Sequence, residues 1–407
     1  MDKPNGRLDS WKAIADYLDR DRTTVMRWER TGGLPVRRVQ GGAGRSVFAF
    51  KDELDRWLAG GGVASADRTP PVAGAPRPRL WRWAAAGVVA LGVAMGGALW
   101  WWRDVSPVAA ATLIGEEIVA TDAAGRQLWR YRLAHVDGNI VPARWLIADI
   151  DGDDRPELLA AVHFMRHSGG GYGTVMVFEG NGQLRWQRSL DDRYTFSGEE
   201  YAPAWFPEDI LVYRTAGVTR IAVAQHHHTW WPGVVVTYDT DGQAIDRFVN
   251  TGWIRRLNIT ADGRYLLAGG ISNSYDGAAL AVLDAAHPGG TSPAGGSLPA
   301  CANCPPGDPV AYFVAPWSQL ARPSDTPNVV VSVDSAGGIQ WHAIQRIGPD
   351  GKAPEVIVAL SPSLALVRQD ENKFFSEMRA GLNRPEMRSP PVRVWTPQAG
   401  WRDAVPR

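Results

Sequence analysis

The chain has 407 residues, with 43 Lys and Arg against 43 Asp and Glu, so its formal net charge is zero. Hydrophobic residues make up 45%, an ordinary fraction for a globular protein, which excludes a wholly unstructured chain. The neutral total conceals an asymmetry, because residues 1–79 hold 15 basic and 10 acidic residues, a net of +5 that leaves −5 for the rest. A basic first part favours nucleic acid as its partner.

Residues 8–30 have the pattern of two short helices. Ser10 is placed to cap the first helix, whose apolar residues recur at helical spacing. After a short polar break, Asp21 is placed to cap a second helix that carries Val25 and Trp28 inward. Two short helices joined by a tight turn form a helix-turn-helix, whose second helix enters the major groove of DNA.

A β-hairpin pattern follows these helices. Two strand-like runs, 36–40 and 45–50, flank a glycine-rich turn at 41–44. Residues 51–58 then read as a closing helix that ends at Gly60. Helix, turn, helix, basic hairpin and helix together predict a small α+β winged helix-turn-helix.

The segments SWKAIADYL, RTTVMRWERTGGLPVRR and VFAFKDELDRWL carry a resemblance to the MerR/excisionase-type winged helix-turn-helix. It covers residues 8–58 of a domain that we place at 1–59. The resemblance implies double-stranded DNA as partner, with the second helix reading base edges and the wing gripping the backbone. The predicted DNA-binding residues are Arg22, Thr23, Thr24, Arg27, Arg30, Arg37, Arg38 and Arg45. The alternative is that these side chains form only a solvated face.

Small residues and prolines dominate residues 60–79, and we predict a disordered linker there. From 83 to 102 the chain runs 20 residues without a charge, which matches the hydrocarbon thickness of a bilayer and predicts a transmembrane helix over 80–103. A buried core helix is the alternative. Arginines before the span place the N-terminus in the cytoplasm of a single-pass inner-membrane protein. Gly92 and Gly96 form a GxxxG that indicates a homodimer face.

Residues 110–407 change to short β-type runs and turns, and we predict an exported all-β domain. A strand, a glycine turn and an outgoing strand recur at 118–133, 175–190 and 234–248, with a looser echo at 329–344. The turn glycines are spaced by 57, 60 and 96 residues, and the last gap has room for one further unit, to which 259–270 could belong. Repeats of this size predict a β-propeller of about five to seven blades, with a β-sandwich as the alternative. The Trp-bearing turns resemble blades of quinoprotein-like propellers.

Carboxylates alternate around a glycine in the segment 149–157, DIDGDDRPE. Such a loop can wrap a hard cation such as Ca²⁺. The segment resembles the DxDGDGxxD/E loop of FG-GAP/VCBS-type propeller repeats, although Asp154 stands where that family often has glycine. By that resemblance, a structural Ca²⁺ would be held by the side chains of Asp149, Asp151, Asp153 and Glu157 and the carbonyl of Arg155. An Asp-rich surface turn without metal is the alternative.

Histidines and cysteines offer two further candidate sites. His163, His167 and the run 226–228 allow a transition-metal or ligand site, but surface histidines at a strand end are the simpler interpretation. Cys301 and Cys304 form a CxxC in a loop rich in Pro and Gly, and we predict a local disulfide. Because proline follows Cys304, haem attachment is excluded. A zinc half-site would need partners that the sequence does not identify.

These observations together predict a membrane-anchored one-component transcription regulator. Its winged helix would bind DNA in the cytoplasm, and its exported propeller would sense an extracytoplasmic ligand or protein. No nucleophile elbow, phosphate loop or HExxH motif is present, so we expect no enzyme. The alternative is an exported ligand-binding, protein-binding or enzymatic propeller whose N-terminal module does not regulate transcription. A quinone-cofactor oxidoreductase would rest on blade resemblance alone.

Overall fold

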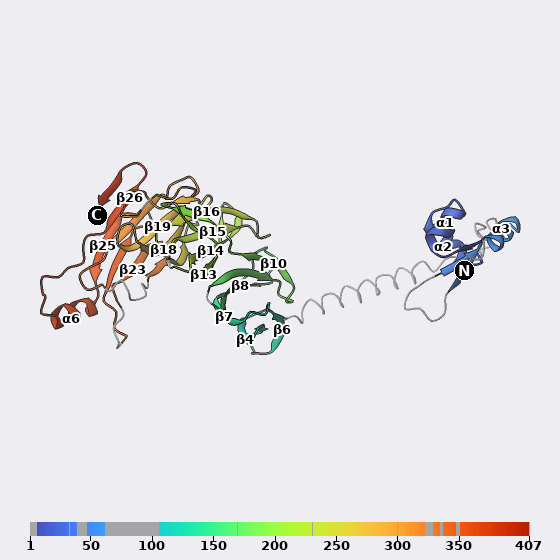
Figure 1. Cartoon of the computed structure of the whole chain (residues 1–407), viewed down its shortest axis with the longest axis horizontal. Coiled ribbons are helices and arrows are strands. Elements are labelled where there is room, and N and C mark those ends of the chain that lie inside the picture. The colour runs from blue at the N-terminus through green and yellow to red at the C-terminus, as the bar shows by residue number, and fades with distance from the viewer. Residues whose placement is uncertain are drawn as a thin grey trace, which may run out of the picture. The chain divides into compact units, whose positions relative to one another are not determined.

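A computed structural model describes residues 6–31, 33–38, 47–61, 106–168, 170–229, 231–298, 300–321, 329–333, 337–346 and 351–406. Contacts divide the chain into two compact units, Met1–Ala98 and Leu99–Arg407 (Figure 1). The predicted transmembrane helix with Gly92 and Gly96, nearly all of the predicted linker, and Arg45 lie outside the described residues. Among the residues described, no helix is both long and apolar enough to cross a membrane.

The N-terminal unit contains its elements in the predicted order. They are α1 (Trp11–Tyr17), α2 (Arg22–Thr31), β2 (Arg37–Arg38), β3 (Val47–Phe50) and α3 (Lys51–Ala59). The sequence did not predict a further strand, β1 (Arg7–Leu8), which pairs with the free edge of β3 and makes a sheet of order β1-β3-β2. Within the described residues, β2 and β3 are shorter than the predicted strands 36–40 and 45–50.

A single small core holds this unit together. Ile14 of α1, Val25 of α2 and Leu54 of α3 are fully buried, and Trp28 is nearly so. The side chain of Ser10 caps α1 by accepting a hydrogen bond from the N–H of Ala13 at 3.1 Å. The predicted inward residues of α2 are therefore the buried ones, and its opposite face is left to solvent.

The second unit consists of five successive antiparallel sheets. The first sheet is β4 (Ala110–Ile114), β5 (Glu117–Thr121) and β6 (Gln127–Arg132). The second is β7 (Gly138–Ala148), β8 (Glu157–Arg166), β9 (Gly171–Phe178) and β10 (Leu184–Ser189). The third is β13 (Trp205–Thr215), β14 (Val218–His227), β15 (Gly233–Tyr238) and β16 (Ala244–Asn250), which the short β20 (Gly290–Thr291) joins in parallel.

The last two sheets carry additions. The fourth is β17 (Ile254–Ile259), β18 (Tyr265–Ser272), β19 (Gly277–Asp284) and β21 (Ala311–Pro316), extended by β26 (Arg393–Thr396) and β27 (Gly400–Asp403). The fifth is β22 (Val329–Val333), β23 (Ile339–Ile344), β24 (Glu355–Leu360) and β25 (Leu366–Glu371). The small hairpin of β11 (Tyr194–Phe196) and β12 (Glu199–Tyr201) and the helix α6 (Lys373–Gly381) complete the unit.

The five sheets pack face to face like propeller blades. The first strands of neighbouring sheets, β7, β13, β17 and β22, lie beside one another in order. Four hydrophobic cores fill the spaces between the first and second, second and third, third and fourth, and fourth and fifth sheets. The prediction of an all-β, propeller-like domain is confirmed, with five sheets rather than the two of a sandwich. β4 and β25 lie at opposite ends of this unit in Figure 1, and no core among the described residues joins the first sheet to the fifth.

Two of the repeated tryptophans connect neighbouring sheets, the first to the second and the second to the third. Trp129 of β6 donates its indole N–H to the carbonyl of Gly180 at 3.0 Å, and Trp186 of β10 donates to Thr240 at the same distance. In each case the ring lies on the turn glycine of the next sheet, where a Cβ on Gly182 or Gly242 would come within 2.6 Å of it. Both glycines have positive φ, so the turn and the close approach both require glycine.

The repeat assignment needs one correction. The first three repeats are the last two strands of the first, second and third sheets, whereas 329–344 and 259–270 cover the first two strands of the fifth and fourth sheets. The spacing of 96 residues therefore compares unlike positions. Glycine turns occur at several places in a sheet, so the pattern alone does not say which strand pair it joins.

Candidate nucleic-acid interface and acidic loop

The N-terminus of α2 is capped by Asp21. Its carboxylate accepts hydrogen bonds from the N–H of Thr24 at 2.9 Å and from the Thr24 hydroxyl at 2.6 Å. These bonds, the side-chain one foremost, lower the pKa of Asp21. The hydroxyl of Thr24, one of the predicted base-contacting groups, is thus engaged within the helix, whereas the neighbouring Thr23 is exposed.

The open face of α2 is basic. Arg22, Arg27 and Arg30 are exposed there, and Arg30 lies in the last turn, where a cation complements the helix dipole. Val25 and Trp28 are buried beneath them. The helix therefore presents three arginines and Thr23 on the side away from the core, as predicted.

The arginines of the hairpin are paired with glutamates of the same unit. Arg37 lies 2.6 Å from the Glu53 carboxylate, and Arg38 lies 3.3 Å from that of Glu29. The side chains of Arg37 and Arg38 remain 54% and 66% exposed, so both stay accessible to a phosphate. Exposed pairs of this kind are weak, and an anionic partner can replace the glutamate at small cost.

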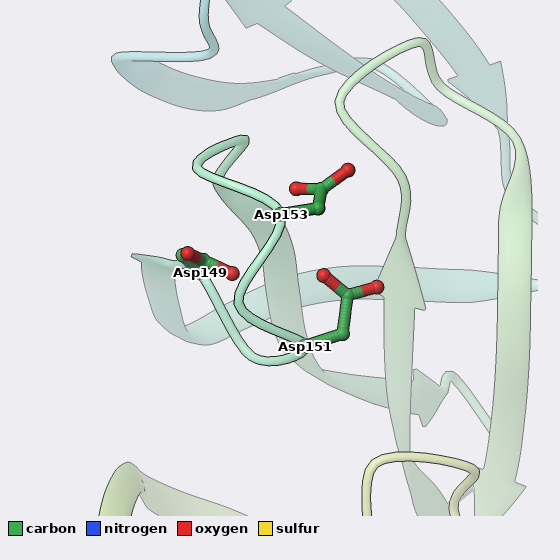
Figure 2. A group of neighbouring side chains, drawn as sticks. All are labelled: Asp149, Asp151 and Asp153. Carbon is green, nitrogen blue, oxygen red and sulfur yellow. The ribbon is translucent and has the colours of Figure 1, made fainter.

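The acidic loop between β7 and β8 gathers three carboxylates. Figure 2 shows Asp149, Asp151 and Asp153 projecting from one loop, and each offers an oxygen within 4.8 Å of the other two. Asp149 also organises the loop, because it accepts the N–H groups of Gly152 at 2.6 Å and Asp154 at 3.1 Å. These bonds lower its pKa and keep it ionised. Asp154, at the position where the resembled family often has glycine, has a φ of +64°.

Glu157 belongs to a different group from the one predicted. Its side chain is 1% exposed and accepts the N–H of Ile150 at 2.9 Å. Burial raises its pKa to about 7. Its carboxylate oxygen clusters with those of Asp151 and Glu179, not with Asp149 and Asp153.

A guanidinium already neutralises part of this second group. Arg185 lies 2.9 Å from Asp151 and 3.5 Å from Glu179. Arg155, the predicted carbonyl ligand, donates its N–H to Asp153 at 2.8 Å. Of the five predicted ligands, Asp149, Asp151 and Asp153 form one carboxylate triad. Glu157 instead belongs to a second triad with Asp151 and Glu179, and Arg155 belongs to neither. A cavity of about 660 Å³ adjoins them, with Asp153, Glu157 and Glu179 among its walls.

Cys301 and Cys304 form a disulfide, with their Cα atoms 5.6 Å apart. The loop is tied to the β11 hairpin: Asn303 accepts the N–H of Thr195 at 2.8 Å and donates to the carbonyl of Arg193 at 3.2 Å. The disulfide therefore shapes a loop that joins segments more than 100 residues apart in the sequence.

The interpretation of the histidine run as surface residues is wrong for two of its members. His226 and His227 are buried, at 3% and 6% exposure, on the last residues of β14, and only His228 beyond the strand is exposed. Burial lowers the pKa of His227 to about 4. Among the residues that the structure describes, no group of three metal-ligating side chains includes a histidine. The sequence could not show this, because the burial comes from neighbouring sheets.

No protein-family model matches the chain, and no curated protein does. Similar solved structures include a Dos1 propeller at 10% identity, covering 63% of this chain and 65% of that one, with a TM-score of 0.34. A eukaryotic initiation factor follows at 10% identity, 65% and 62% coverage and a TM-score of 0.31. The WD40 domain of SCAP from fission yeast has 9% identity, 64% and 72% coverage and a TM-score of 0.27. The chain thus spans less than two thirds of the first two, and likeness this distant carries no inference about function.

Proposed function

We propose that the chain is a membrane-anchored one-component transcription regulator, with a DNA-binding N-terminal unit and a sensory, non-enzymatic β unit. The observation that carries the proposal is the exposed basic face of α2 beside the paired but accessible arginines Arg37 and Arg38. A helix-turn-helix places such a helix in the major groove and uses flanking arginines on phosphates. The net charge of +5 over residues 1–79 supports the same partner.

DNA binding is tested with fragment 1–62, whose core lies wholly within it, and with the full-length protein. We expect Arg37→Ala with Arg38→Ala to weaken binding to all DNA sequences and to reduce the salt dependence by about two phosphate contacts. Lys51→Ala, at the start of α3, is the control for loss of a single positive charge. The Lys51 ammonium lies 5.1 Å from the Tyr17 ring centroid within the same unit, so we expect its removal to weaken DNA binding less. Failure of fragment 1–62 to bind DNA at low salt would refute the DNA-binding function.

The anchoring part of the proposal rests on the uncharged run 83–102 and the arginines that precede it. Dimerisation through Gly92 and Gly96 would raise the avidity for DNA by effective concentration. Reporter fusions at either end of the chain test the sidedness. We expect a cytoplasmic reporter to be active at the N-terminus and inactive at the C-terminus, and the reverse result would overturn the proposed topology.

Ca²⁺ at the acidic loop is a second part of the proposal, with a structural role. Three aspartates of one loop lie close together and offer carboxylate oxygens. Ca²⁺ binds oxygen ligands in flexible geometries, so these residues suit it. Arg185 pairs with two members of the Glu157 group, Asp151 and Glu179, but only with Asp151 of the Asp149–Asp151–Asp153 group. The latter group is therefore the one that would hold the ion. We expect Ca²⁺ to raise the melting temperature, Asp153→Asn to reduce the shift, and Asp154→Asn in the same loop to preserve it. A wild-type protein without a Ca²⁺-dependent shift would contradict the site.

A second candidate function is an exported propeller that binds a ligand or protein without any link to transcription. The cavity beside Glu157 and Glu179 is the observation that favours it. DNA binding by fragment 1–62 separates the two candidates, because only the regulator requires it.

A further inference from the structure

Three inner strands carry a β-bulge at the same place. The pairing register of β7 with β8 shifts at Ala143, that of β13 with β14 shifts at Glu208, and that of β17 with β18 shifts at Arg255. Because β7, β13 and β17 are neighbours, the three bulges lie on three adjacent sheets. Bulges re-aim side chains and are common beside binding sites. Two of these three bulged residues are charged.

Aromatic rings and histidines connect the bulges across the sheets. His163 of β8 stacks on Phe206 of β13 with centroids 4.9 Å apart, and His226 of β14 lies 5.1 Å from Trp253, which precedes β17. The two histidines occupy equivalent places, since each is paired with a glycine of the next strand, Gly173 or Gly233. The second, third and fourth sheets thus contribute equivalent positions to one cluster.

Arg255 is the member of this cluster that carries a charge but forms no ion pair among the described residues. Its guanidinium lies 4.8 Å over the ring of Trp253, and the described residues offer no hydrogen-bond acceptor to its enclosed Nη1 atom. Burial lowers the pKa of Arg255, although the charge of Glu208 acts in the opposite direction. Arg247 shows the contrast: burial opposes its charge too, but the Asp192 carboxylate at 2.5 Å more than offsets this and raises the pKa.

Glu208, the nearest acidic group, is directed to His226 instead. Nε2 of His226 lies 3.0 Å from the Glu208 carboxylate, and Nδ1 lies 2.7 Å from the carbonyl of His227. The Glu208 carboxylate thus lies against His226, and among the described residues it forms no ion pair with Arg255.

We propose that the aligned bulges form a binding site for the oxyanion group, carboxylate or phosphate, of a small solute. Arg255 contacts the anion, and Trp253 holds the guanidinium in place. A planar guanidinium fork on an aromatic face is suited to bidentate contact with either oxyanion. That this solute is the sensed signal rests on the proposed regulatory function, but binding itself does not.

The test measures the melting temperature of the β unit by tryptophan fluorescence in the full-length protein, without DNA. Sodium phosphate and sodium succinate are titrated separately at constant ionic strength. We expect at least one to raise the melting temperature saturably, by about 2–4 °C. The responding anion identifies the oxyanion class. Absence of a saturable shift with both anions would overturn the proposal.

Two variants locate the site. Arg255→Gln is expected to abolish the shift and, because it removes a charge that forms no ion pair among the described residues, to melt at or above the wild-type temperature without anion. Arg264→Gln is the matched control, since Arg264 also lies over a ring, that of Tyr265, but is exposed in the turn before β18. We expect it to keep the shift. A retained shift in Arg255→Gln, or a fall of several degrees in its melting temperature without anion, would show that Arg255 is only structural.

Discussion

The two units of the chain differ in how exposed their charged side chains are. In the N-terminal unit the described arginines lie on the surface, and Arg37 and Arg38 stay more than half exposed although each has an ion pair. In the β unit, Glu157 is buried and Arg255 is partly buried with an enclosed Nη1 atom, and the pKa of each is displaced toward the neutral form. Exposed ion pairs contribute little to stability, whereas an enclosed charge is costly unless it is matched. The charges of the first unit are therefore accessible from solvent, whereas the buried charge of the second makes its stability depend on protonation.

The largest effect on stability is expected at Trp186, which connects the second and third sheets of the β unit. Trp186→Ala removes a ring that is 6% exposed and its hydrogen bond to Thr240, and should lower the free energy of unfolding by about 3–5 kcal/mol. Trp186→Phe should cost less, because the ring contact with Gly242 is kept. Urea unfolding measures both. If the N-terminal unit unfolds at a lower urea concentration as well, the two units are not independent.

The buried carboxyl should make the stability of the β unit depend on pH. The pKa of Glu157 is raised from 4.5 to about 7 in the fold, so between these values the folded state binds more protons than the unfolded state. Its contribution is fully present below pH 4.5 and is lost as pH rises to 7, by about 1–3 kcal/mol. Glu157→Gln should remove this loss of stability, which is checked by measuring the free energy of unfolding between pH 4.5 and 7. His227, whose pKa is lowered to about 4, acts in the opposite direction in both proteins. If the stability of the wild-type protein and that of Glu157→Gln depended on pH in the same way, the raised pKa of Glu157 would be contradicted.

A smaller effect is expected at the surface pairs. Glu53→Gln and Glu29→Gln release Arg37 and Arg38 from their intramolecular partners and remove two negative charges from the proposed DNA face. Each should tighten DNA binding by about two- to fivefold, in keeping with the strength of exposed ion pairs. Titration of labelled DNA at two salt concentrations measures this. Asp52→Asn, whose partner Arg56 is also exposed, is the control; equal tightening there would indicate a general charge effect.

The smallest effect is expected at Asp154. Its φ of +64° is a conformation that glycine adopts freely and that aspartate tolerates. Asp154→Gly should therefore change the free energy of unfolding by less than about 0.5 kcal/mol, because the relief of strain is offset by the greater freedom of glycine in the unfolded chain. Thermal unfolding measures it. A loss well above 1 kcal/mol would mean that the Asp154 carboxylate has a structural role of its own.

Local pattern predicted much of the fold. Helical spacing and a capping residue identified α1 and α2, since these depend on contacts three or four residues apart. The recurring glycine turns identified the strand pairs of the first three sheets for the same reason. Strand β1 was missed because two residues carry no periodicity, and the pairing that defines it comes from β3.

The sequence by itself determined the two unlike units, their element types, and the presence of an acidic loop, a CxxC loop and a basic helix face. Only the tertiary structure decided which side chains share an environment. It separated Glu157 from the Asp149 group, buried His226 and His227, and aligned the bulges at Glu208 and Arg255. The physical reason is that burial and charge pairing arise between sheets, from residues far apart in the chain. Periodicity along a single strand carries no information about them.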